Sequence, residues 1–237
     1  MRARAVLYVS VVVGFLAGCA GTRGVQVHLV SELQPDAELQ SENTVVSAGA
    51  WKSTFPGFLL GVQHLDDPTL NRRFPGVSFR GARSANPFTY GNWVDPELGY
   101  VPPRFTVFEV AVRTREADRV RLDLSKVCLK TDRGDSLDHF ALEGPNSLVS
   151  RYQEDWSEDP SLVETAKGLA ERALLRGNWL RKGESEGGYL VFPYLDPAVY
   201  RVTLCLPVVV EREGVADTVR VMLGFKQKLE RLDLPVR

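Results

Sequence analysis

The sequence contains few of the side chains that most often carry catalysis or hold metal ions. Among its 237 residues there are three histidines and three cysteines. Zinc sites need three or four histidine, cysteine or carboxylate ligands in a defined cluster, whereas each candidate group here combines one histidine with carboxylates. The two groups are His64 with Asp66 and Asp67, and His139 with Asp135 and Asp138. We therefore predict solvated polar loops at both places, with no metal and no other cofactor.

An excess of charge of one sign is also missing. The chain has 29 basic and 30 acidic residues, which gives a formal net charge of −1 at pH 7. Binding to nucleic acid needs basic residues concentrated on one face or along one helix. The composition therefore predicts no nucleic-acid partner.

A catalytic serine is not supported by its surroundings. The run Gly183-Glu184-Ser185-Glu186-Gly187 matches the G-x-S-x-G pattern of α/β-hydrolases. That pattern requires a strand before the serine, a helix after it and a histidine later in the chain. All three histidines precede Ser185, so we predict a turn between strands here and no enzymatic activity.

Long hydrophobic runs are confined to the first residues of the chain. An apolar run of about 13 residues (5–17) follows Arg2 and Arg4, which is shorter than the roughly 20 residues of a membrane-spanning helix. These are the parts of a secretory signal. The run ends in Leu16-Ala17-Gly18-Cys19, and Leu16 does not suit an ordinary A-x-A cleavage site.

This segment resembles the lipobox of bacterial lipoproteins. The resemblance implies that residues 1–18 are a signal peptide and that the thiol of Cys19 receives a diacylglyceryl group before cleavage. Several acyl chains hold a protein firmly at a membrane. Ala20, in place of an aspartate after the cysteine, favours the outer membrane over the inner membrane.

Two cysteines, Cys128 and Cys205, remain once Cys19 carries lipid. Both lie on the more polar phase of strand-like runs. An oxidising envelope compartment permits a disulfide between them if the two strands are neighbours. The alternative is two free, partly buried thiols, and the sequence leaves both open.

Alternating apolar and polar residues predict short β-strands along much of the chain. The first covers residues 25–30, another is predicted at 44–48, and the clearest series begins at residue 105. The members of this series are 105–114, 119–124, 126–130, 200–208 and 219–225. Short strands separated by polar turns are typical of a β-sandwich.

One helix interrupts the strands, from about residue 160 to 176. Asp159 suits the N-cap, Pro160 the first helical position and Gly177 the position after the end. The predicted buried stripe consists of Leu162, Ala166, Leu169 and Ala173. After the helix, residues 179–180 and 189–192 predict a β-hairpin around a glycine-rich turn.

Residues 52–104 predict a long loop region, because proline or glycine interrupts them every few positions. Arginine and aromatic side chains alternate there, and both are enriched in binding hot spots. The candidate partner-binding residues are Arg72, Arg73, Arg80, Arg83 and Trp93. The alternative is that the aromatic side chains pack under the loops while the arginines are solvated.

The part of the chain from about residue 105 resembles immunoglobulin-like sandwich domains of bacterial lipoproteins. Three motifs carry the resemblance: FxVFEVxVRT, KGExxGGYLVFP at 182–193 and YRVTLCL. The resemblance implies a fold more than a chemistry. We therefore predict that residues 19–237 form a single, mainly β domain of immunoglobulin-like type, with core strands from 105 onward and one inserted helix.

Together these features predict a lipid-anchored envelope protein that acts as a non-catalytic binding or accessory module. Its partner is expected to be an envelope protein or a glycan. One alternative is a small-ligand-binding protein that uses the 52–104 loops. Another is an envelope hydrolase whose catalytic residues are scattered across loops.

Overall fold

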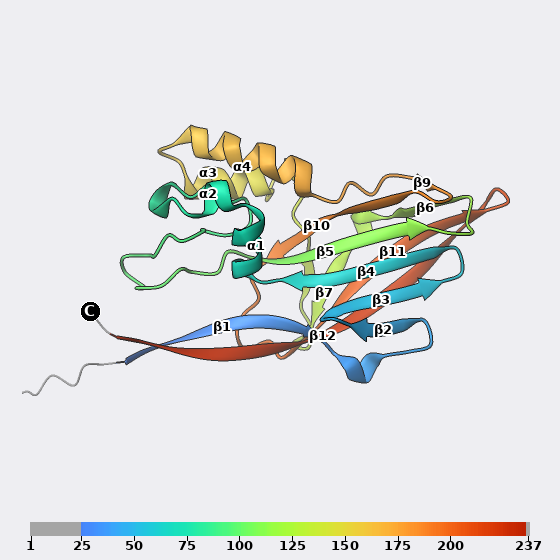
Figure 1. Cartoon of the computed structure of the whole chain (residues 1–237), viewed down its shortest axis with the longest axis horizontal. Coiled ribbons are helices and arrows are strands. Elements are labelled where there is room, and N and C mark those ends of the chain that lie inside the picture. Colours follow the sequence, from blue (N-terminus) through green and yellow to red (C-terminus); the bar gives the residue numbers. More distant parts are fainter. Residues whose placement is uncertain (1–24, 236–237) are drawn as a thin grey trace, which may run out of the picture.

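The protein is a sandwich of two antiparallel β-sheets (Figure 1). The structure, a computed structural model, describes residues 25–235. The first sheet, sheet A, has the strand order β1-β12-β11-β6-β9, with β7 also beside β11 and β8 beside β7. The second sheet, sheet B, has the order β10-β5-β4-β3-β2. The predicted mainly β sandwich is confirmed.

The strands of sheet A are β1 (Val25–Pro35), β6 (Arg119–Leu122), β7 (Cys128–Thr131), β8 (Ser136–Asp138), β9 (Leu180–Arg181), β11 (Arg201–Arg212) and β12 (Val215–Pro235). Those of sheet B are β2 (Thr44–Ser47), β3 (Ala50–Phe55), β4 (Phe58–Leu65), β5 (Phe105–Thr114) and β10 (Ser185–Pro193). The α-helices are α1 (Asp67–Arg73), α2 (Pro75–Ser78), α3 (Leu148–Asp155) and α4 (Pro160–Ala173). Short 3-10 turns cover Ala37–Leu39, Gly81–Arg83 and Leu124–Lys126.

The inner faces of the two sheets enclose the main hydrophobic core. Along β5, Phe108, Val110 and Val112 are buried, whereas Ala111 and Arg113 are exposed. The inner residues of β11 belong to the same core, and they are Val202, Leu204, Leu206, Val208 and Val210. This two-residue period is what the alternating pattern of residues 105–114 predicts.

A second core lies on the outer face of sheet B, where the helices cover the ends of β4, β5 and β10 (Figure 1). We call α1–α4 together with the loop at 84–104 the helical lobe. Phe105 and Val107 of β5 pack into this second core from the sheet, and Tyr152 of α3 packs into it from the lobe. The first half of β5 is therefore buried on both faces.

The predicted loop at 52–104 is wrong for its first half, where residues 52–78 form strands and helices. Residues 50–65 form β3 and β4, with Trp51 and Ser53 buried on one face of β3. A tight turn at Pro56 and Gly57 joins the two strands, so these residues connect elements and do not mark an irregular segment. After β4 come α1 and α2, and the irregular part is the loop at 84–104.

The helical prediction holds for α4 but is incomplete. Asp159 caps α4 and Pro160 begins it, although the helix ends at Ala173 and Gly177 lies beyond its end. Its buried residues are Val163, Ala166 and Ala170, so the predicted stripe is rotated by about one residue. A second helix, α3, precedes it and was not predicted.

The predicted hairpin around the glycine-rich turn is also wrong. Strand β9 pairs with β6 in sheet A, whereas β10 pairs with β5 in sheet B. The turn at 182–184 therefore carries the chain from one sheet to the other.

Strands β1 and β12 form a long two-stranded ribbon. They pair over the whole length of β1, with Val25 opposite Pro235 at one end and Pro35 opposite Phe225 at the other. Figure 1 shows the far ends of the two strands running together beyond the rest of the sandwich. The strand predicted at 25–30 is confirmed and continues to Pro35.

Candidate functional site: an aromatic cleft and an acidic pocket

Arg104, the residue before β5, is sealed beneath the helical lobe with 2% of its side chain exposed. Its guanidinium carbon lies 4.4 Å from the ring centroid of Trp156. Three more ring centroids lie within 5.2 Å, those of Tyr90, Tyr152 and Phe105. A cation over a desolvated aromatic face gains about 2 kcal/mol. The four rings therefore form a cage for the arginine.

One carboxylate balances the caged charge. Arg104 Nη2 lies 2.5 Å from Asp155 Oδ2, and Nη1 donates to the carbonyl oxygen of Asn86 at 3.1 Å. The hydroxyl of Tyr90 donates to the other oxygen of Asp155 at 3.1 Å. Burial and the neighbouring carboxylate raise the pKa of Tyr90, so this hydroxyl keeps its proton. The cluster joins the loop, β5 and the end of α3.

A cleft of about 420 Å³ opens beside this cluster, and we call it the aromatic cleft. Its apolar walls are Tyr90, Trp93, Leu98, Pro102, Pro103 and Trp156, and its polar groups include Ser84, Asp95 and Asp155. The rings of Tyr90 and Trp93 meet edge to face at 5.7 Å. Ligand pockets typically enclose about 300–1,000 Å³ and combine apolar walls with a few polar groups. The cleft has both properties.

Buried polar side chains hold the loop that carries Tyr90 and Trp93. Asn86 donates to Ser78 Oγ at 2.9 Å and to Asn71 Oδ1 at 3.2 Å. Thr89 donates to the same Asn71 oxygen at 2.5 Å. Phe88 between them is fully buried. Because these bonds fix the loop to α1 and α2, the cleft is largely pre-organised for a ligand.

The structure separates the predicted partner-binding arginines. Arg73 donates to both oxygens of Glu109 at 2.6 and 2.8 Å, and therefore serves to attach α1 to sheet B. Arg72, Arg80 and Arg83 are exposed, and Arg83 lies 3.8 Å from Asp159 at the start of α4. Of the predicted set, Trp93 lines the cleft, while Arg80 and Arg83 flank two residues that line it, Gly81 and Ala82.

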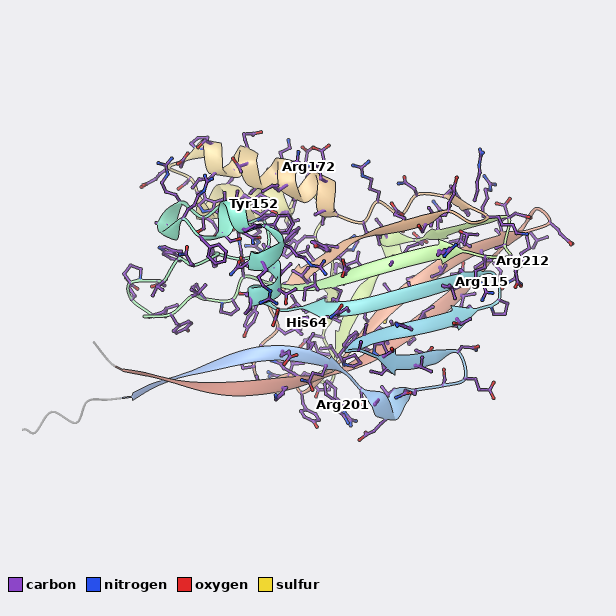
Figure 2. All side chains as sticks on the ribbon, in the orientation of Figure 1. His64, Arg115, Tyr152, Arg172, Arg201 and Arg212 are labelled. Atoms are coloured by element: carbon purple, nitrogen blue, oxygen red, sulfur yellow. The ribbon has the colours of Figure 1, made fainter. Side chains whose placement is uncertain are left out.

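A second, smaller pocket lies where β1 meets the end of β4. It encloses about 230 Å³ and is lined by charged, polar and apolar groups that include Glu32, His64, Asp66, Asp67 and Tyr194. Figure 2 shows His64 at the lobe end of β4, near β1. We call this the acidic pocket, because three of these side chains are carboxylates.

Burial sets the protonation of the groups in the acidic pocket. It lowers the pKa of His64 to about 4 against the opposing effect of Asp66, so the imidazole is neutral at pH 7. The backbone N–H of Leu33 donates to its Nδ1 at 3.4 Å, as a neutral ring permits. Burial and the charge of Asp66 raise the pKa of Asp67 to about 7. The pocket can therefore hold or release a proton near neutral pH.

The predicted solvated loops are found only in part. Asp135 and Asp138 are exposed, as predicted, whereas His64 and His139 are half-buried. His64 lies in β4, and Asp66 caps α1 by accepting from the backbone N–H of Thr69 at 2.8 Å. His139 directly follows β8, and burial lowers its pKa. Within residues 25–235, no three histidine, cysteine, aspartate or glutamate side chains gather into a group that could hold a metal ion.

Ser185 begins β10 and follows the turn that leads from sheet A to sheet B. The predicted turn between strands is correct for Gly183 and Glu184, whereas Ser185, Glu186 and Gly187 already belong to β10. A strand follows this serine where a nucleophile elbow would have a helix, so the motif does not have the geometry of an α/β-hydrolase.

The two cysteines predicted on outward phases are direct cross-strand partners. Cys128 of β7 lies opposite Cys205 of β11, and both are free thiols in the structure. Burial, followed by a hydrogen bond with the Cys128 thiol, raises the pKa of Cys205 to about 11. The two strands are neighbours, as a disulfide requires, so the disulfide and the pair of free thiols both stay predictions.

Cys19, the predicted site of the lipid anchor, lies outside the described residues. Among the helices of residues 25–235, none is long and apolar enough to cross a membrane.

Comparison with known proteins identifies no family. No family model matches the chain, and no curated protein matches it. One solved structure shows a weak likeness, a secreted protein from Mycobacterium tuberculosis called MPT63. The two are 12% identical, the match covers 65% of this chain and 82% of that one, and the TM-score is 0.27. A TM-score this low says nothing about a shared function.

Sequence patterns did not predict the aromatic cage around Arg104. Its members come from positions 90, 104, 105, 152 and 156, which lie in three separate segments. The one available signal was the mixture of arginine and aromatic residues at 72–104, which pointed to the correct segment. It did not single out Arg104, because burial distinguishes this arginine from its neighbours.

Proposed function

We propose that this chain is a lipid-anchored protein of the bacterial cell envelope that binds an envelope glycan through the aromatic cleft, without catalysing a reaction. The lipobox at residues 16–19 supports the anchor, and Ala20 supports the outer membrane. The aromatic cleft is the single observation that carries the binding function.

The walls of the cleft suit a sugar ring. Tyr90 and Trp93 present partly exposed aromatic rings to the cleft, and the C–H faces of a sugar ring pack well against such surfaces. Trp156 is 9% exposed and lies against Arg104, so it adds to the apolar wall beside them. Hydroxyl groups of the sugar can donate to the carboxylates of Asp95 and Asp155. In such a cleft the aromatic walls contact the faces of the sugar ring, and the carboxylates bind its hydroxyl groups at the same time.

Two exposed arginines are sequence neighbours of residues that line the cleft. Arg80 and Arg83 flank the lining residues Gly81 and Ala82, and both arginines are exposed. Exposed arginines attract anions and pair readily with carboxylate groups. A glycan with acidic substituents would gain more from these arginines than a neutral glycan.

The ribbon of β1 and β12 supports a tethered arrangement. Cys19 precedes Val25 by six positions. Strand β1 has 11 residues, which at about 3.3 Å per residue corresponds to a ribbon of roughly 35 Å. A lipid at Cys19 would thus anchor one end of the ribbon, and the sandwich would lie at the other end.

Calorimetric titration with soluble, acidic peptidoglycan strands tests this function. We expect Trp93→Ala to weaken binding by about 30-fold or more, as the loss of a hot-spot aromatic does. Trp179→Ala is the matched control, because Trp179 is 38% exposed and stacks with Arg119 and Arg121 of sheet A, away from the cleft. Equal binding by Trp93→Ala and the native chain would overturn the proposal.

The acidic pocket favours a second candidate, the binding of a small organic cation. Glu32, Asp66 and Asp67 line it together with a neutral His64. An ammonium group would find carboxylate partners there. A polyamine such as spermidine should then raise the melting temperature of the native chain and not that of Asp66→Asn, whereas an equal rise in both would exclude this pocket.

A further inference from the structure

Three sulfur-containing side chains lie in one row across sheet A. Cys128 of β7 is opposite Cys205 of β11, and Cys205 is opposite Met222 of β12. All three point away from the main core, since the inward positions beside them are Leu129, Leu204 and Leu223. Directly opposed residues of antiparallel strands have Cβ atoms about 4.5–5.5 Å apart. The three side chains are therefore within reach of a common point.

The row lines a single cavity on the outer face of sheet A. This cavity encloses about 630 Å³ and includes Cys128, Cys205 and Met222. Cys205 is 8% exposed and Met222 is 53% exposed, so the row runs from a sheltered thiol to an accessible thioether. A small ion could enter from the side of Met222.

We propose that the dithiol form of this row binds one soft monovalent metal ion, Cu⁺ or Ag⁺, through the two cysteine Sγ atoms and the Sδ atom of Met222. Thiolate and thioether ligands select Cu⁺ over harder ions. On binding, each thiol gives its proton to solvent, two metal–thiolate bonds form, and the thioether donates a lone pair. No electron is transferred.

The charge around the row favours the resulting complex. Two thiolates and one monovalent cation leave a net charge of −1. Lys126, Lys130 and Arg220 line the same cavity. Nearby cations stabilise an anionic centre. The surroundings of the row therefore offset the charge that metal binding creates.

The ligand set does not suit zinc. Zinc prefers four ligands from cysteine, histidine and carboxylate groups. The described residues contain no group of three such side chains that could hold a metal. Asp138 of β8 is the next residue in the row beyond Cys128, but it is exposed and does not line the cavity. The third ligand available is a thioether.

A disulfide between the same two cysteines is the competing state. Directly opposed residues of antiparallel strands have Cα atoms about 4.5–5.5 Å apart, which lies within the range of disulfides. Forming that bond would remove two electrons and two protons and consume both thiolate ligands. The metal site and the disulfide are therefore mutually exclusive.

The test uses the full chain with Cys19→Ala, so that Cys128 and Cys205 are its cysteines. The reduced protein is titrated with Cu⁺ without oxygen, in competition with the chromophoric chelator bicinchoninate. We expect one Cu⁺ per chain. Cys205→Ser should weaken binding by at least about 100-fold, and Met222→Leu by about 10-fold, within the range that ligand-shell changes produce. Thr218→Ala, in the same cavity, should leave binding unchanged.

Met222→Leu keeps the test independent of folding, because Met222 is a surface residue and leucine has a similar volume. Binding by the reduced chain no tighter than by a Cys128→Ser, Cys205→Ser double variant would overturn the proposal. Unchanged binding by Met222→Leu would overturn the three-sulfur site. A chain that keeps its disulfide under reductant and binds no Cu⁺ would also overturn it.

Discussion

Arg104 and Asp155 form an ion pair of 2.5 Å in which the cation is buried and the carboxylate reaches the wall of the aromatic cleft. The pair joins the start of β5 to the end of α3. It therefore connects the sandwich to the helical lobe at the place where the cleft forms. Figure 2 shows Tyr152, one of the rings around Arg104, inside this lobe.

Removal of the carboxylate should be costly. Asp155→Ala leaves the guanidinium of Arg104 buried without a counter-charge, and breaking a buried pair in this way costs about 3–5 kcal/mol. Glu154→Ala is the matched control in the same helix. Glu154 pairs with Arg151 at the surface, where such a pair contributes about 0–1 kcal/mol. Urea unfolding of the native chain and the two variants measures the difference. Similar losses of unfolding free energy in both variants would show that the buried pair contributes no more than the surface pair.

The backbone of the cleft loop should tolerate a side chain at one glycine and not at another. Gly91 has φ +65, and a Cβ there would clash with the carbonyl oxygen of Ser78. Gly99 has φ +76, with nothing within 4 Å of its Cβ position. We expect Gly99→Ala to cost about 1–2 kcal/mol from the left-handed backbone alone.

Gly91→Ala carries the same backbone penalty and also forces the loop away from α2. Its loss of stability should therefore exceed that of Gly99→Ala, and it should weaken glycan binding as well. Thermal unfolding and calorimetric titration check the two effects. Equal losses of stability and of glycan binding in both variants would mean that the loop does not depend on the close approach of Gly91 to Ser78.

The acidic pocket should give two opposite pH dependences of stability. The pKa of Asp67 is raised from 3.8 to about 7, so the folded state keeps a proton that the unfolded chain has lost. Its contribution falls as the pH rises from about 4 to 7. The pKa of His64 is lowered from 6.5 to about 4, so its contribution falls as the pH drops from about 6.5 to 4.

Between about pH 4 and 6.5 the two slopes oppose each other in the native chain. Asp67→Asn should make the slope of unfolding free energy against pH more positive, by up to about 1.4 kcal/mol per pH unit. His64→Gln should make it more negative by a similar amount. Urea titrations at several pH values provide the slopes. Changes of the same sign in both variants would contradict the assignment.

The lipid anchor has a direct chemical test. Cys19→Ser should abolish the incorporation of labelled palmitate and release the protein from the membrane fraction. Cys128→Ser, which removes a cysteine of the sandwich, should keep both properties. Palmitate still attached to Cys19→Ser would exclude the lipobox.

Sequence patterns predicted the elements that are buried on one face. The strand at 105–114 matches β5. Its second half keeps the two-residue period because one face there meets solvent, whereas its first half is buried on both faces. The outward positions of Cys128 and Cys205 follow from the same period. Their pairing does not, since it depends on which strands become neighbours in the sheet.

Other elements were hidden by local composition. The turn at Pro56 and Gly57 made β3 and β4 resemble an irregular loop, although the strands on either side are regular. Helix α3 has eight residues, too few for a clear periodic pattern. The cage around Arg104 depends on contacts between distant segments, which no local pattern encodes.

The indole N–H resonances of the tryptophans test the central claim most directly. Trp93 and Trp156 line the aromatic cleft, Trp179 stacks with arginines of sheet A, and the indole of Trp51 donates to Gly224 in the core. On addition of acidic peptidoglycan strands, we predict shifts for Trp93 and Trp156 and none for Trp51 and Trp179. Shifts confined to Trp179, or none at all, would contradict binding at the cleft.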